Sequence, residues 1–103
     1  MKPITVPDSQ ESLEKAAAVL KAIAHPVRLR IISILKNENE LPVNEICQET
    51  GCEQSLASHH LNAMKIRGLI KSRRDGKQIF YSLKEQELIG LLACIQKCNC
   101  NFA

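Results

Sequence analysis

Residues 42–83 read PVNEICQETGCEQSLASHHLNAMKIRGLIKSRRDGKQIFYSL, and the spacing within this stretch decides the fold. Residues 43–50 and 54–67 each show the apolar spacing of a short amphipathic helix. Gly51 lies between them and supplies a sharp helix exit, since such exits often need a positive φ. Gly68 ends the second segment. The stretch therefore begins with two helices that are separated by a tight turn.

A two-stranded ribbon is expected directly after these helices. Residues 70–74 and 77–83 are strand-like in composition. They are joined by Asp75-Gly76, a dipeptide typical of two-residue hairpin turns. The pattern thus predicts a helix–turn–helix unit followed by a β-hairpin.

Further helices are expected on both sides of this unit. The residue before a proline avoids the α region, so His25-Pro26 separates two helical segments. We expect a flexible arm at residues 1–8, a first helix that is capped by Ser9 or Ser12 and reaches residue 24, a second helix at 26–36, a polar link at 37–41 and a last helix at 84–98. The prediction is one mainly α domain, residues 9–103, with a small β-hairpin and the order α-α-α-α-β-β-α.

Composition and charge narrow the function classes. The chain has 103 residues, of which 45% are hydrophobic and only 3% aromatic, so the core must be aliphatic, as in packed helices. The net charge of +3 is small, but the cations gather in one region with Asp75 as its single acid: Lys65, Arg67, Lys71, Arg73, Arg74 and Lys77. We find neither a secretory leader nor an apolar run of membrane-spanning length, and we expect a cytoplasmic protein without a membrane partner.

The segment 54–67 carries an apolar stripe on one face and polar groups on the other. The polar groups can bond to base edges in a DNA major groove, and the cations of the hairpin can bind phosphates. The alternatives are a merely solvated helix face and a solubilising hairpin. We expect His60 to be packed or bonded to a phosphate rather than to read bases. Arg28 and Arg30 fit either a contact with the DNA backbone or a solvated face. The candidate DNA-binding residues are Gln54, Ser55, Ser58, His59, Asn62, Arg73, Arg74, Lys77 and Gln78.

Three segments together, KAIAHPVRLRIISIL, ASHHLNAMKIRGL and RRDGKQIFYSL, resemble the ArsR/SmtB family of bacterial repressors. The resemblance implies a winged helix-turn-helix that forms a homodimer through its first and last helices. It also implies binding to double-stranded operator DNA, an imperfect palindrome, with no cofactor required, and release by an inducer that is usually a metal ion or metalloid. The apolar positions that we assign to the dimer interface are Leu13, Leu20, Leu88, Leu91, Leu92 and Ile95.

The five cysteines fall into two groups. Cys47 and Cys52 take positions where a small apolar residue suits the helix–turn–helix, so we expect them to pack. Cys94 and Cys98 are four residues apart and share a helix face, and Cys100 follows closely. Three thiolates suit soft ions, so we expect As(III), Sb(III) or a soft divalent metal such as Zn or Cd to act as inducer at this cluster.

Other functions remain as alternatives at this stage. The same cysteines fit a repressor that responds to thiol oxidation or reactive sulfur, and a tail with no sensory role also fits. A winged helix can serve as a protein-interaction module, but its recognition face would then be apolar or acidic. We expect no enzyme, because the histidines and cysteines form no legible pair of nucleophile and base.

Overall fold

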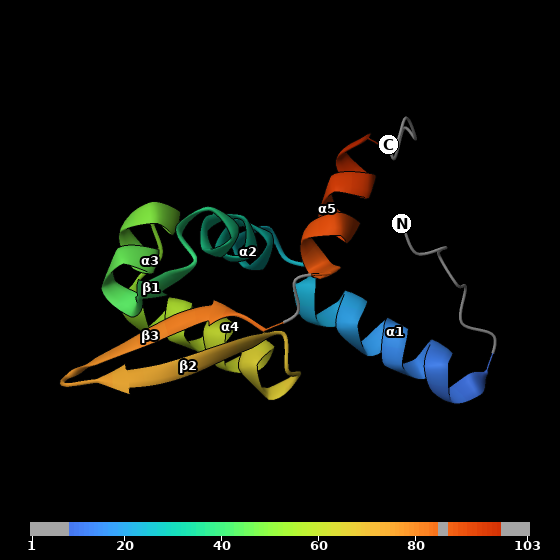
Figure 1. Ribbon diagram of the computed structural model, residues 1–103, viewed down its shortest axis with the longest axis horizontal. Coiled ribbons are helices and arrows are strands. Elements are labelled where there is room, and N and C mark those ends of the chain that lie inside the picture. The colour runs from blue at the N-terminus through green and yellow to red at the C-terminus, as the bar shows by residue number, and fades with distance from the viewer. Residues whose placement is uncertain (1–8, 85–86, 98–103) are drawn as a thin grey trace.

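The computed structural model describes residues 9–84 and 87–97, which form helices packed around a small antiparallel sheet (Figure 1). The elements, in chain order, are α1 (Gln10–Ile23), α2 (Pro26–Glu38), β1 (Glu40–Pro42), α3 (Val43–Thr50), α4 (Gln54–Ile66), β2 (Ile70–Asp75), β3 (Gln78–Leu83) and α5 (Glu87–Lys97). The winged helix-turn-helix is confirmed, with α3 and α4 as its two central helices and β2–β3 as its wing. Within the described residues, no helix is long and apolar enough to cross a membrane.

Local sequence signals set the helix ends. The Ser9 hydroxyl caps α1 by accepting a hydrogen bond from the amide of Ser12 at 3.1 Å, so Ser9 is the cap of the two candidates. His25 caps α2, where its Nδ1 accepts from the Val27 amide at 3.1 Å. Gly51 ends α3 in the left-handed region, with φ of 73°.

The predicted polar link at 37–41 is wrong in part, because residues 40–42 form a strand. This strand, β1, pairs antiparallel with β3 and places Leu41 opposite Tyr81. The sheet order is therefore β1-β3-β2, with the central strand supplied by the second half of the hairpin. Three residues are too few to show the alternation by which a strand is recognised. Burial of the Leu41 side chain in the core stabilises β1 in this position.

The hairpin turn lies one residue later than predicted. Asp75 pairs with Gln78 as the last residues of the two strands. The turn residues are therefore Gly76 and Lys77 rather than Asp75 and Gly76, and Gly76 has φ of 65°. This shift places the Lys77 side chain at the tip of the wing.

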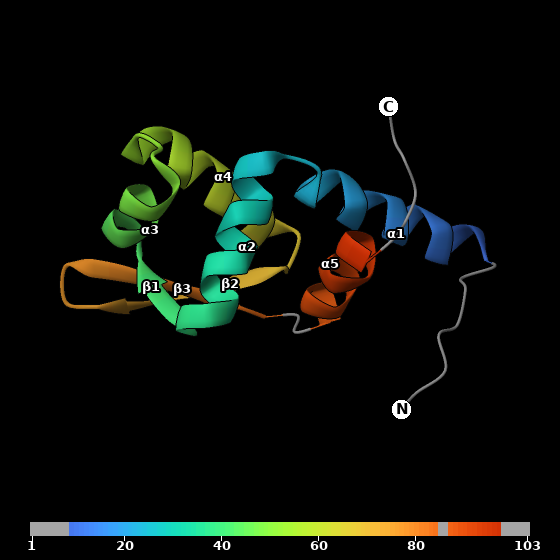
Figure 2. The same cartoon turned by 90° about the horizontal axis from the view of Figure 1, so that it is seen from above.

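The core joins α2, α3, α4 and the sheet with the end of α1 and the start of α5, and the wing tip and α1 extend toward opposite ends of the molecule (Figures 1 and 2). The largest fully buried side chains are Ile31, Ile32, Leu35, Ile46, Leu61, Met64 and Ile70. These residues are aliphatic or Met, as the scarcity of aromatic residues requires.

We expect Leu61→Ala to lower the free energy of unfolding by about 2–5 kcal/mol, because it leaves a cavity beneath α4. Ile66→Ala is the matched control in the same helix, since Ile66 is 73% exposed. Its effect should stay within about 0.5 kcal/mol. Urea denaturation followed by circular dichroism measures both. Equal effects of the two substitutions would contradict the packing described for α4.

Candidate nucleic-acid interface

Helix α4 has one buried apolar face and one largely exposed polar face. Ala57, Leu61 and Met64 are fully buried, as the sequence predicts, and His60 is only 4% exposed. On the other side, the side chains are exposed except for that of Ser58, which is half-buried: Gln54, Ser55, Ser58, His59 and Asn62. The packed face fixes the helix, so the polar set is presented on a rigid support.

A concave surface of about 290 Å³ lies between the start of α4 and the wing. It brings together candidate residues from both elements, namely Gln54 and Ser58 from α4 and Lys77 and Gln78 from the wing. The pairs lie about twenty residues apart in sequence, and the fold of the hairpin beside α4 unites them. The candidates outside this lining are Ser55, His59, Asn62, Arg73 and Arg74.

Two further polar residues line this concave surface and were not among the predicted ones. Asn44 lies in the first turn of α3, and Tyr81 lies on β3. Alternation along the strand puts Tyr81 on one face with the apolar Ile79 and Leu83, so the sequence pattern indicates burial for it rather than a polar contact. Nothing in the sequence near Asn44 signals its approach to the wing. Both side chains can donate hydrogen bonds to a phosphate.

Arg73 is held by the protein itself. Its Nε and Nη2 donate to the two carboxylate oxygens of Glu40 at 2.7 Å each, and its guanidinium lies 4.8 Å from the centre of the Phe80 ring. Asp75 lies 3.7 Å away as a second acidic partner. The hydrogen bonds from Arg73 lower the pKa of the Glu40 carboxyl. Arg73 therefore ties β2 to β1 across β3, and its charge is largely matched.

The other wing cations face outward. Arg74 donates from Nε to the carbonyl of Gly76 at 3.3 Å, which keeps its guanidinium beside the turn. Lys77 occupies the turn and is exposed. Arg74 and Lys77 thus present positive charge at the wing tip.

Arg28 and His60 meet behind the exposed polar face of α4. Arg28 donates from Nε to His60 Nδ1 at 3.0 Å and from Nη1 to the Ala22 carbonyl at 3.0 Å. Burial lowers the pKa of His60, and the nearby bases His25, Arg28 and His59 lower it further. The packed position predicted for His60 is confirmed. Arg28 is half-buried and engaged by internal hydrogen bonds, so it is not a merely solvated side chain, whereas Arg30 is exposed. A DNA-backbone contact stays a prediction for both.

Apolar surface remains on α1. Leu13 and Leu20 are 47% and 50% exposed. Of the interface candidates on α5, Leu88 is already buried in the core of the single chain, while Leu91 and Leu92 are half-buried against it. The side chain of Ile95 lies outside the described residues.

The structure describes three of the five cysteines. Cys94 is a free, exposed thiol on α5, and Cys98 and Cys100 lie outside the described residues. Cys47 and Cys52 are half-buried free thiols. Across residues 9–84 and 87–97, no three His, Cys, Asp or Glu side chains gather as a metal site.

Known proteins resemble the chain over nearly its whole length. Residues 25–72 match the model of the bacterial regulatory protein arsR family. The chain is 38% identical over 91 residues to the HTH-type transcriptional regulator YgaV of Escherichia coli K12, a match that covers 88% of this chain and 92% of that protein.

Solved structures agree with this similarity. The crystal structure of NolR from Sinorhizobium fredii is 33% identical, with a TM-score of 0.79, and the match covers 94% of this chain and 95% of that chain. A homodimeric winged helix-turn-helix DNA-binding domain from Mycobacterium bovis, solved by solution NMR, is 30% identical with a TM-score of 0.73. That match covers 90% of this chain and 87% of the other.

We expect Arg73→Gln to raise the pKa of Glu40 toward its ordinary value, because the carboxylate loses its two hydrogen bonds. In the unsubstituted protein the folded pKa is depressed, so the pair stabilises the fold above the ordinary carboxyl value. That stabilisation is lost as the pH falls through the folded pKa. Carboxyl ¹³C NMR titration measures the change, and Arg74→Gln is the control that should leave Glu40 unaltered. An ordinary Glu40 titration in the unsubstituted protein would contradict the ion pair.

Proposed function

Because the chain belongs to the ArsR family of bacterial regulatory proteins, we propose that it is a homodimeric repressor that binds double-stranded operator DNA through α4 and the β2–β3 wing. Members of this family are DNA-binding transcriptional regulators rather than enzymes. We place its action in the cytoplasm, where it meets the chromosome.

The concave surface between α4 and the wing is the observation that carries this proposal. A helix of this size fits the major groove of B-DNA, where base edges carry a distinct pattern of donors and acceptors. The carboxamide of Gln54 can pair with adenine in a bidentate manner, and Ser55, Ser58 and His59 can bond to other base edges or phosphates. The wing then lies beside the flanking backbone.

The cations at the wing tip supply the phosphate contacts. Each cation that neutralises a phosphate releases condensed counterions, which gives affinity without reading sequence. Lys77 and Arg74 fit this role because they are exposed at the tip. Arg73 contributes less, since Glu40 already matches its charge.

Apolar surface on α1 supports the homodimer. Leu13 and Leu20 remain half exposed in the single chain, and burial in a second copy would remove them from water. The M. bovis relative of this fold is a homodimer. A two-fold dimer would hold two copies of α4 about 34 Å apart, so the operator would be an imperfect palindrome with half-sites one helical turn apart.

We expect Gln54→Ala and Lys77→Gln to weaken DNA binding in different ways. Gln54→Ala should cost about 1–3 kcal/mol on the operator and little on random DNA, because it removes a base contact. Lys77→Gln should weaken binding to both duplexes and lower the slope of affinity against salt by about 1. Fluorescence anisotropy with an operator duplex selected in vitro, compared with a scrambled duplex, measures both.

The matched control is Lys36→Gln, which removes an exposed cation in the last turn of α2, where it lies beside α5 and not on α4 or the β2–β3 wing. Its salt slope should equal that of the unsubstituted protein. If the protein bound the selected and scrambled duplexes equally at low salt, the repressor proposal would be overturned.

For the inducer we propose a thiophilic metal or metalloid, As(III) first, at Cys94, Cys98 and Cys100. The exposed thiol of Cys94 and the four-residue spacing to Cys98 support this choice. Arsenous acid would exchange its three hydroxyls for three cysteine sulfurs and release three waters. A soft divalent ion would need a fourth ligand in addition to these thiols. Oxidation of the same thiols is the second candidate trigger.

We expect As(III) or Sb(III) to release reduced protein from the operator, because ligation draws the end of α5 into a new arrangement. The variant with Ser at positions 94, 98 and 100 should keep its affinity for the operator and lose this response. Anisotropy with native mass spectrometry measures release and bound ion together. Release by persulfide or peroxide alone would favour the redox trigger, and a metalloid response that survives in the triple variant would exclude the cluster as the metalloid sensor.

A further inference from the structure

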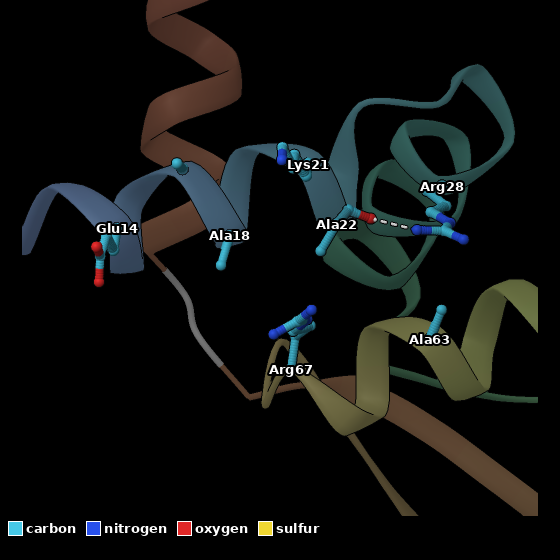
Figure 3. Close-up of a pocket in the computed structure, with 8 residues that line it drawn as sticks. Glu14, Ala18, Lys21, Ala22, Arg28, Ala63 and Arg67 are labelled. Carbon is cyan, nitrogen blue, oxygen red and sulfur yellow. Dashed lines mark hydrogen bonds between the residues drawn. The ribbon is translucent and has the colours of Figure 1, made fainter. Parts of the chain in front are cut away.

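The C-terminal end of α1 is joined to α4 by hydrogen bonds from one arginine. Arg28, in the first turn of α2, donates to the Ala22 carbonyl near the end of α1 (Figure 3). The same guanidinium donates from Nε to His60 Nδ1 on α4. The path from Ala22 through Arg28 to His60 thus connects three helices through two bonds of 3.0 Å each.

The side chains beside this path leave a gap between α1 and α4. A cavity of about 490 Å³ separates the two helices, and Figure 3 shows Arg67 projecting into the space between them. Its walls include the short side chains of Ala18, Ala22 and Ala63, and Arg28 closes one side. Core packing fixes α4 through its buried stripe, and the hydrogen-bonded path adds a tie between α4 and the end of α1 on the side where this gap lies.

The path demands one protonation state of His60. Since the Arg28 Nε–H donates to Nδ1, Nδ1 must carry a lone pair, and neutral His60 must hold its proton on Nε2. That Nε2 is buried and has no hydrogen-bond partner among the described residues. A second proton on Nδ1 would set two donors and two positive charges against each other at 3.0 Å.

The surroundings of His60 also disfavour the charged imidazole. The His25 ring, from the link before α2, lies 4.4 Å from it, and the His59 ring lies 5.6 Å from it in α4, both measured between ring centres. The charged and titratable groups that act on His60 are His25, Arg28 and His59, all of them bases with no carboxylate among them. The environment therefore selects the neutral form that the hydrogen bond needs.

We propose that Arg28 and His60 are positioning residues that lock α4 to the end of α1, and that this lock holds only while His60 is neutral. Neither side chain needs to touch DNA for this role, because both act by fixing the face that carries Gln54, Ser58 and His59. The proposal rests on operator binding through α4, as set out above. It adds that operator binding weakens when acid protonates His60, although His60 does not contact the DNA.

The direction of the pH effect follows from the depressed pKa of His60. In the unfolded chain the imidazole takes up a proton near its ordinary value of 6.5, whereas the folded chain resists it to lower pH. The stabilisation by the lock is therefore complete above 6.5 and falls as the pH drops from there toward the folded pKa. Protonation of His59 beside DNA would act oppositely, since a new cation strengthens binding to phosphate.

The first experiment observes the lock without DNA. Long-range ¹H–¹⁵N NMR of the imidazoles at pH 8 should show His60 with its proton on Nε2, and a titration should give it a pKa below 6.5. In Arg28→Gln that pKa should rise, because a cationic neighbour is gone, while Arg30→Gln should leave it unchanged. A proton on Nδ1 at pH 8, or equal titrations in all three proteins, would overturn the proposal whether or not DNA is bound.

The second experiment separates His60 from the other histidines. His60→Asn keeps an oxygen acceptor for Arg28 but cannot titrate, and it retains His25 and His59. Its operator affinity should match that of the unsubstituted protein at pH 8 and exceed it by roughly tenfold one pH unit below the pKa of His60. His60→Leu, with no acceptor, should bind roughly fivefold to tenfold more weakly at pH 8. An affinity ratio of His60→Asn to unsubstituted protein that stays constant from pH 8 to one unit below the measured pKa of His60 would overturn the lock.

Discussion

The burial of a single stripe on α4 is the constraint on which the rest of the structure depends. Ala57, Leu61 and Met64 are removed from water by α2, α3 and the sheet, and this packing fixes the rotation of the helix about its axis. A rotated α4 would expose Leu61 and bury Ser55 or Asn62, at a cost in both apolar and polar solvation. Core packing therefore determines which way the polar face of α4 points. The turn at Gly51 fixes where α4 begins, and the wing lies beside it.

Local sequence patterns predict much of this architecture. The limits of α3 and the start of α4 follow from apolar spacing and from Gly51, whose φ of 73° few other residues adopt readily. The hairpin follows from strand composition and a turn glycine, although the pairing of Asp75 with Gln78 moves the turn by one residue. These features depend on neighbours within a few positions, which is why a single sequence contains them.

Contacts between distant residues were beyond such patterns. Strand β1 exists because β3 offers it an edge some forty residues later. Arg73 is hydrogen-bonded to Glu40, 33 positions away in sequence, and Arg28 to His60, 32 positions away. Neither pair has a sequence signature, so the sequence alone predicts a DNA contact for Arg73 and does not predict the internal hydrogen bonds of Arg28. The predicted residues on α4 and at the wing tip depend on helix phase and turn position alone, and the structure gathers four of them at one concave surface.

The pairing of Arg73 with Glu40 has a consequence for how this fold can diverge. Residue 40 lies in a short strand outside α4 and the β2–β3 wing, yet its carboxylate decides whether Arg73 is engaged within the protein or available as a cation. Replacement of that one acid in a descendant would add a positive charge to the wing surface without altering a residue of the wing itself. The positive charge that the protein offers to a polyanion can thus change through a residue outside the wing, while α4 is left unaltered.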